Sequence, residues 1–192
     1  MTTVRTLGCA VVLALVAALA VASSDAAPRT FPATGEVEVA FTPGDAIDRL
    51  IVDAVDRAQS EILVNAYNFT HRGIARALVA ARGRGVAVSV IADLEQARAT
   101  PQSVLPELVS GGVEVRLDGN FQNAHNKVIV IDAGGAHPVT ITGSFNYTFA
   151  AQRHNAENVI VLRDNAQVAK AYRDNWRRLR ETTTSWSAKA LR

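Results

Sequence analysis

The chain has 192 residues and contains only one cysteine, Cys9. Cys9 lies in the N-terminal segment, ahead of the part of the chain that is expected to fold. The folded part is therefore predicted to have no thiol, which excludes disulfide bonds, cysteine nucleophiles and thiolate metal ligands. A chain of this length can be held together by apolar burial in one domain.

Two common hydrolase signatures are also missing. The sequence has no His-Glu-x-x-His segment, and the spacing of His125, His137 and His154 does not match a zinc site. Gly143-Ser144 lacks the Gly-x-Ser-x-Gly elbow of the serine hydrolases. The sequence therefore predicts a site that uses no metal and no cofactor.

No apolar run is long enough to be a standard membrane span. The longest, Leu7–Ala22, has sixteen residues, whereas a spanning helix needs about 20. Arg5 precedes this run and small residues follow it at positions 20–26, so we predict a secretory signal peptide over residues 1–27. An uncleaved anchor is the alternative. The prediction implies a secreted or periplasmic protein, with the proline-containing residues 28–35 as a flexible tether.

Beyond residue 36 the apolar pattern alternates between the periods of a strand and of a helix. We expect one domain over residues 36–182, followed by a C-terminal tail over residues 183–192. This alternation predicts the α/β class, with a mixed, largely parallel β-sheet flanked by helices on both faces. The expected strands are 36–41, 62–67, 86–91, 113–117, 128–131 and 158–162, and the expected helices are 47–58, 74–81, 102–110 and 165–180, with residues 94–100 a loop or short helix.

The segment His125-Asn126-Lys127 carries the most specific chemistry. If it lies on a strand, alternate side chains share a face, so the imidazole of His125 and the ammonium of Lys127 lie side by side. An imidazole can attack phosphorus and form a covalent phosphohistidine. Lys127 can neutralise the charge that develops on the phosphoryl oxygens. The pair therefore indicates phosphodiester cleavage.

Further polar residues follow this pair. Asp132 ends the apolar run 128–131, and Gly143-Ser144-Phe145-Asn146 has the composition of a strand-to-turn transition. The hydroxyl of Ser144 and the amide of Asn146 can bind phosphate oxygens. Glu157 opens the next apolar strand, where its carboxylate can hold the imidazole in one tautomer.

Together these residues resemble the His-x-Lys-x-x-x-x-Asp motif of the phospholipase D superfamily. The similarity extends to Ile62–Thr70, Ala77–Val86 and Tyr172–Trp176, and covers about residues 37–180. The chain as a whole resembles the small bacterial endonucleases of that superfamily, which carry one copy of the motif. The resemblance implies metal-independent hydrolysis of phosphodiesters.

In that superfamily, two copies of the motif meet at one site. One histidine attacks phosphorus, and the other protonates the leaving oxygen and then activates water. Because this chain has only one His-x-Lys segment, the resemblance implies a homodimer with a shared site. It assigns catalysis to His125, Lys127 and Glu157, phosphate binding to Ser144 and Asn146, and a structural role to Asp132.

The chain departs from the family pattern in one loop. Ten residues, 133–142, separate Asp132 from Gly143, whereas the family usually has six. The excess lies in the turn-rich string 133–138 and predicts a longer hairpin loop. The simplest interpretation is that this loop leaves the site intact, whereas a bent hairpin would displace Ser144.

Three functions remain open at this stage: a non-specific endonuclease on DNA or RNA, a phospholipase D acting on lipid headgroup diesters, and an inactive module that binds nucleic acid or membrane. The formal net charge is only +2, but residues 163–192 carry eight basic and three acidic residues. A basic C-terminal helix beside the site would suit a polyanion. The alternative is a solvated helix face. Phe121, Phe145 and Phe149 are the candidates for an apolar mouth of a lipid enzyme.

Overall fold

The computed structural model describes residues 27–187. The predicted signal peptide therefore lies outside the described residues, apart from Ala27. Within the described residues, 31–187 form one compact unit. No helix within residues 27–187 combines the length and the apolar character needed to cross a membrane.

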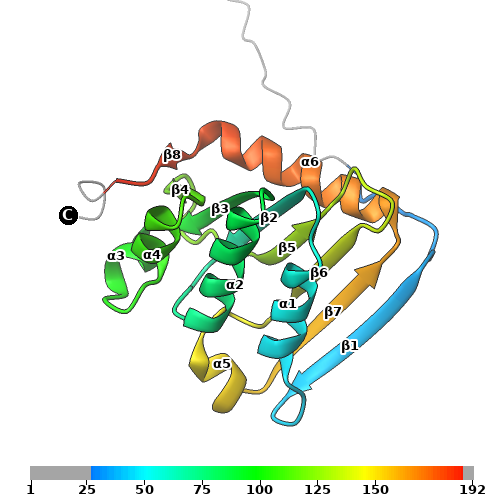
Figure 1. Cartoon of the computed structure of the whole chain (residues 1–192), viewed down its shortest axis with the longest axis horizontal. Coiled ribbons are helices and arrows are strands. Elements are labelled where there is room, and N and C mark those ends of the chain that lie inside the picture. The colour runs from blue at the N-terminus through cyan, green and yellow to red at the C-terminus, as the bar shows by residue number, and fades with distance from the viewer. Residues whose placement is uncertain (1–26, 188–192) are drawn as a thin grey trace, which may run out of the picture. The chain divides into compact units, whose positions relative to one another are not determined.

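The described part of the chain is built around one eight-stranded sheet with the order β1-β7-β6-β5-β2-β3-β4-β8 (Figure 1). Most of its strands fall within a residue or two of the predicted ranges. The strands are β1 (Glu36–Thr42), β2 (Glu61–Ala66), β3 (Ala87–Asp93), β4 (Glu114–Asp118), β5 (Lys127–Ile131), β6 (Val139–Gly143), β7 (Glu157–Arg163) and β8 (Thr184–Ser185).

The sheet is mixed, as predicted, but the expectation that it is largely parallel was wrong. Only β2 with β3 and β3 with β4 pair in parallel. The other five pairings are antiparallel. Parallel neighbours need a long crossover, whereas β5 and β6 are joined by the short loop 132–138, which can only make a hairpin.

Helices cover both faces of the sheet, as predicted. One face carries α1 (Ile47–Asp56) and α2 (Arg72–Gly83), whose fully buried side chains include Ile51, Ile74 and Leu78. They pack with the short helix α4 (Leu105–Ser110) and with one side of the strands. This is the larger of the two apolar cores on the sheet.

The other face is covered by α6 (Ala166–Thr182). Trp176 is 2% exposed, and its indole Nε1 donates to the carbonyl oxygen of Val64 at 2.9 Å. Tyr172 packs in the same cluster, as predicted for a core residue, whereas Val168 is only half-buried and its neighbour Ala169 is buried instead.

Of three short elements, α3 (Leu94–Ala99) agrees with one of the two predicted alternatives for residues 94–100, whereas α5 (Phe149–Arg153) and β8 were not predicted. The helix α3 is capped by Asp93, whose Oδ1 accepts from the backbone N–H of Gln96 at 2.7 Å. Strand β8 lies within the predicted C-terminal tail and pairs with β4, so residues 183–187 belong to the fold.

Candidate active site at one edge of the sheet

The motif residues gather at the edge of the sheet where the parallel strands end. The register pairs Ala66, the last residue of β2, with Lys127, the first of β5. On the other side of β5, Val128 pairs with Thr142, and Gly143 of β6 pairs with Val159 of β7. The start of β5, the end of β6 and the start of β7 therefore meet at one edge, called here the catalytic edge. Ligand sites in α/β sheets typically lie beyond the carboxyl ends of the parallel strands.

His125 and Lys127 lie side by side at this edge. The Nζ atom of Lys127 is 3.0 Å from Nδ1 of His125 and donates to the carbonyl oxygen of His125 at 3.0 Å. His125 precedes β5, so the predicted strand alternation is not what brings the two side chains together. The ring of Tyr67 fixes the pair instead, with its centroid 4.2 Å from the imidazole centroid and 4.8 Å from Nζ.

The Lys127 ammonium is buried, with the residue only 6% exposed. Burial lowers the pKa of Lys127 below its ordinary value, and the negative charge of Glu157 opposes this shift. A cation with little water around it gains strongly from an incoming anion. The environment of Lys127 therefore suits a phosphate oxygen as ligand.

The contact between Lys127 and His125 constrains the imidazole proton. When the ammonium donates to Nδ1, the neutral imidazole must carry its proton on Nε2. Attack on phosphorus by Nε2 requires the other tautomer. Lys127 must therefore leave Nδ1, for example to bind a phosphate oxygen, before His125 can act as a nucleophile through Nε2.

Glu157 and Ser144 form the second half of the site. The Ser144 hydroxyl donates to Oε2 of Glu157 at 2.5 Å and accepts from the backbone N–H of Asn158 at 3.1 Å. The amide of Asn155 donates to Oε1 of Glu157 at 2.9 Å. The Glu157 backbone N–H donates to the hydroxyl of Thr42 at 3.0 Å. These contacts hold the carboxylate at the start of β7.

No hydrogen bond joins Glu157 to His125 within residues 27–187, so the orienting role of Glu157 stays a prediction. Sequence reasoning did not find Tyr67, Thr42 or Asn155 as supports of the site. Asn155 could have been found from the sequence, because it is a polar residue two positions before Glu157. Tyr67 and Thr42 come from distant segments and carry no local signal.

Asn146 lies in the turn after Ser144 and is half-buried. Its side-chain oxygen is buried and has no hydrogen-bond partner, and the same holds for Asn68 in the loop after β2. Buried polar atoms are nearly always paired in folded proteins. This oxygen can accept a hydrogen bond but cannot donate one to a phosphate oxygen, so the phosphate-binding role of Asn146 stays a prediction for its NH₂ group.

Asp132 lies at the opposite end of β5 from Lys127. Its carboxylate accepts hydrogen bonds from the backbone N–H groups of Gln59, Ser60 and Glu61 at 2.7–2.9 Å, and from the Ser60 hydroxyl. Burial alone would raise the pKa of Asp132, but these hydrogen bonds hold it below its ordinary value. Asp132 therefore ties the connection between α1 and β2 to the end of β5.

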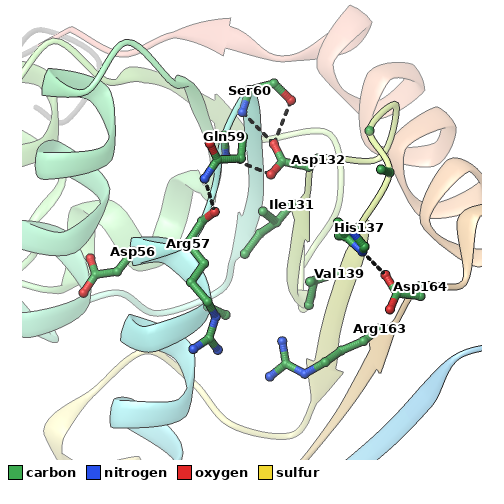
Figure 2. Close-up of a pocket in the computed structure, with 13 residues that line it drawn as sticks. Asp56, Arg57, Gln59, Ser60, Ile131, Asp132, His137, Val139, Arg163 and Asp164 are labelled. Atoms are coloured by element: carbon green, nitrogen blue, oxygen red, sulfur yellow. Dashed lines mark hydrogen bonds and ion pairs between the residues drawn. The ribbon is translucent and has the colours of Figure 1, made fainter.

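A cavity of about 890 Å³ lies beside Asp132 at this far edge (Figure 2). The longer loop supplies one wall through Gly135, Ala136 and His137, and Nδ1 of His137 lies 3.1 Å from Oδ1 of Asp164. The cavity contains none of the predicted catalytic residues. The extra loop residues therefore lie away from the catalytic edge, and the regular β5–β6 register leaves Ser144 in place.

Two arginines of the basic C-terminal helix form ion pairs away from the catalytic edge. Arg177 of α6 pairs with Glu61 at 3.3 Å, and Arg180 pairs with Glu114 at 2.7 Å. Glu61 and Glu114 are the first residues of β2 and β4, at the end of these strands opposite to the catalytic edge. Because these two arginines neutralise acidic strand ends, the ion pairs favour the alternative of a solvated helix face over a surface for a polyanion.

No group of three or more histidine, cysteine, aspartate and glutamate side chains in the described part of the chain is placed to hold a metal ion. The catalytic edge instead brings together an imidazole, a buried ammonium, a hydroxyl and a carboxylate, which belong to His125, Lys127, Ser144 and Glu157. That set matches the family pattern.

A family model described as "Cardiolipin synthase, PLD-like domain" matches residues 51–180. The chain belongs to the phospholipase D superfamily. A protein of Rickettsia bellii named phospholipase D is 40% identical over 141 residues, which are 73% of this chain and 67% of that protein. A mitochondrial cardiolipin hydrolase of Xenopus tropicalis is 35% identical over 123 residues, 64% of this chain and 56% of that protein.

The fold is also shared with a solved member of the superfamily. The crystal structure of the phospholipase D family member Nuc from Salmonella typhimurium matches with a TM-score of 0.73 and 32% identity. The match covers 80% of this chain and 99% of Nuc. The predictions of a phospholipase D-like α/β fold and of a phosphodiester hydrolase are confirmed at the level of the superfamily.

Proposed function

We propose that this phospholipase D superfamily member is a metal-independent endonuclease that works through a phosphohistidine on His125. The observation that carries the proposal is the placement of the His125 imidazole against the buried Lys127 ammonium, at the edge where Ser144 and Glu157 also lie. A nucleophile beside a poorly solvated cation is the arrangement that phosphodiester cleavage needs.

The reaction runs in two displacements. The Nε2 atom of His125 bonds to phosphorus, and the bond between phosphorus and the leaving oxygen breaks as that oxygen takes a proton from a second imidazole. Water then gives its proton to the second imidazole and attacks phosphorus, and the His125–phosphorus bond breaks. Lys127, Ser144 and Asn146 bind the phosphoryl oxygens, and Glu157 accepts a hydrogen bond from the imidazole that has released Lys127.

The second imidazole is proposed to come from a second copy of the chain. The chain has one His-x-Lys segment, so one copy supplies one motif histidine. Two copies related by a two-fold axis through the catalytic edge would supply both. In that arrangement His125 is the nucleophile in one subunit and the general acid in the other.

An apolar sheet face supports this dimer. Val37, Val39 and Phe41 alternate along the edge strand β1 and are 55–56% exposed. They point away from the core side, where Ala40 is buried. The register places Leu162 and Ile160 of β7 directly opposite Val37 and Val39, so the four form one surface. We call Val37, Val39, Phe41, Ile160 and Leu162 the apolar face.

The apolar face reaches the catalytic edge, because Phe41 is followed by Thr42, the residue that pairs with Glu157. A contiguous exposed apolar surface on a strand at the sheet edge needs a cover in water. A second copy of the same chain fits the position, because docking there would bring two catalytic edges together.

The exposed side chains at the catalytic edge favour nucleic acid over lipid. Phe145 is 1% exposed and cannot contact a membrane, whereas Phe121 and Phe149 are exposed. Arg72, at the start of α2, and Arg153, at the end of α5, are exposed as well. These two rings do not form the contiguous apolar rim that a bilayer surface requires, and the exposed arginines suit a polyanion.

A phospholipase D activity on lipid headgroup diesters is the second candidate. It is favoured by the names of the Rickettsia and Xenopus relatives and uses the same chemistry. An inactive module that binds nucleic acid or membrane is the third, and the intact set of His125, Lys127 and Glu157 argues against it. Secretion or export to the periplasm remains part of the proposal.

A parallel assay on plasmid DNA, RNA and phosphatidylcholine vesicles in excess EDTA separates these candidates. The proposal predicts nicking and degradation of nucleic acid by the wild type and none by His125→Ala. Release of choline without nucleic acid cleavage would replace the proposal with the phospholipase. Complete loss of activity in EDTA, restored by a divalent cation, would contradict the metal-independent mechanism.

A further inference from the structure

The short helix α5 lies between two parts of the candidate site. Asn146 precedes it by three residues, and Asn155, which bonds to Glu157, follows it by two. Its first residue, Phe149, is 60% exposed, the highest value among the exposed large apolar side chains of the described residues. An apolar ring is therefore presented to solvent within a few residues of the phosphate-binding turn.

The position of Phe149 is fixed by buried contacts of the same helix. The hydroxyl of Thr148 caps the helix by accepting from the backbone N–H of Ala151 at 3.1 Å. The side chain of Gln152 is nearly buried, accepts from the N–H of Asp48 at 3.0 Å and donates to the carbonyl of Asp45 at 2.9 Å. The ring therefore projects from a helix that is anchored to the start of α1.

The hydroxyl of Thr42, which shares one proton between two carbonyl oxygens, joins this helix and the segment after it to the catalytic edge. The hydroxyl of Thr42 lies 3.1 Å from the carbonyl oxygen of Ala151 and 3.0 Å from that of Asn155. The same hydroxyl accepts from the backbone N–H of Glu157. Thr42 thus bonds both to the helix that carries Phe149 and to Glu157, which fixes the position of the ring relative to the site.

The groups around the ring are cationic or polar. The guanidinium carbon of Arg153 lies 6.0 Å from the ring centroid, and the imidazole of His154 meets the ring edge-on at 5.9 Å. A phenyl ring next to a guanidinium is the combination that binds unpaired bases, because the ring stacks on the base and the cation attracts the backbone phosphate.

We propose that Phe149 and Arg153 form a stacking site for an unpaired nucleobase next to the cleaved phosphodiester. This inference rests on the proposed nuclease function and adds that the substrate is single-stranded nucleic acid or an unpaired segment. A base within a duplex has its faces covered by its neighbours and cannot stack on a side chain unless it is flipped out. A lone ring between charged groups is a poor membrane anchor, since membrane insertion relies on larger apolar areas.

The test measures binding and cleavage of a labelled single-stranded oligonucleotide and of its duplex. Four proteins are compared: wild type, Phe149→Leu, Phe149→Trp and Phe121→Ala. Phe149→Leu keeps an apolar side chain without a ring, Phe149→Trp keeps a ring, and Phe121→Ala removes another exposed ring. Thermal melting checks that each variant folds.

Phe149→Leu is expected to weaken single-strand binding roughly 10-fold and to raise KM by the same factor, with little change in kcat. Phe149→Trp and Phe121→Ala are expected to bind the single strand within about twofold of wild type, because a base–aromatic stack is what the site supplies. Binding of the duplex is expected to be weaker and insensitive to residue 149.

Equal single-strand affinity of wild type and Phe149→Leu would overturn the stacking site, and so would equal losses on single strand and duplex. If Phe149→Leu loses affinity only for anionic vesicles, the ring is a membrane anchor and the inference is wrong. Binding is read separately from cleavage. Ring-dependent binding without cleavage would contradict the nuclease, whereas cleavage without ring dependence would contradict only the stacking site.

Discussion

The Nζ atom of Lys127 lies 3.0 Å from Nδ1 of His125, and both side chains rest against the ring of Tyr67. This contact couples the charge of the lysine to the tautomer of the histidine. An incoming phosphate that draws Lys127 away also frees Nδ1, so substrate binding would prepare the nucleophile. The contact therefore gives the two motif residues linked roles: Lys127 binds the phosphate, and its movement sets the tautomer of His125.

The lowered pKa of Lys127 predicts a loss of activity at alkaline pH. As pH rises through this pKa the ammonium becomes neutral, so kcat/KM should fall at a pH below about 10.4, the ordinary value for lysine. The guanidinium of Lys127→Arg stays charged throughout this range. This variant should therefore be less active than wild type but should not show the alkaline fall in kcat/KM, called here the alkaline limb. A kcat/KM profile from pH 6 to 10.5 checks this, and an unchanged limb in the arginine variant would contradict it.

Glu157 should influence the same limb. Its negative charge opposes the lowering of the Lys127 pKa, so Glu157→Gln should move the alkaline limb to still lower pH. It should also reduce kcat by roughly 10- to 100-fold if the carboxylate orients His125. Asn155→Ala serves as a control, because it removes one hydrogen bond to Glu157 and leaves the charge. A limb that stays in place in Glu157→Gln would show that the two charges are not coupled.

Asp132 should matter for stability rather than for chemistry. Asp132→Ala leaves the three backbone donors of residues 59–61 without their acceptor, and should lower the free energy of unfolding by about 2–4 kcal/mol at pH 7. Because the folded state lowers the pKa of Asp132, its contribution is present above about pH 4, the unfolded value, and is lost as pH falls through the folded pKa.

Urea unfolding at pH 7 and pH 3 measures this difference between wild type and Asp132→Ala. The deficit of the variant should shrink at pH 3. Asp56→Ala is a suitable control, since Asp56 is exposed at the same edge and its loss should change stability by about 0.5 kcal/mol or less. A folded Asp132→Ala with no measurable turnover would assign Asp132 to the chemistry.

The apolar face should mediate self-association. Val39→Arg places a charge in its centre and should convert the purified mature chain from dimer to monomer, with loss of turnover and with retained secondary structure. Gln102→Arg adds the same charge at an exposed position elsewhere and should remain an active dimer. Sedimentation velocity and activity on plasmid DNA provide the measurement. An active monomeric Val39→Arg would remove the two-histidine scheme.

The sequence predicted which residues lie close together in the site better than it predicted how the fold brings them together. His125 and Lys127 do lie together as predicted, but not through strand alternation, because His125 precedes β5 and both side chains lie against the Tyr67 ring. The contact between Ser144 and Glu157 depends on the register of β6 with β7. Register arises from pairing between distant segments, which no local pattern in the sequence specifies.

For the fold too, the sequence predicted the local elements but not how they pair. Apolar periodicity predicted the strands and the long helices because each buries a face of fixed period. It did not predict which strands become neighbours, so the antiparallel majority was missed. The helix α5 has five residues, too few for a helical period to be recognised, and its cap and the buried Gln152 decide its formation.

The account depends most on a covalent bond between His125 and phosphorus. Turnover of an internally ³²P-labelled oligonucleotide should be quenched in alkali within the first cycle, and the protein digested and its peptides mapped. The account predicts label on the peptide that contains His125, stable to alkali, released by acid and absent from His125→Ala. Turnover by the wild type with no protein-bound label at any quench time would contradict it.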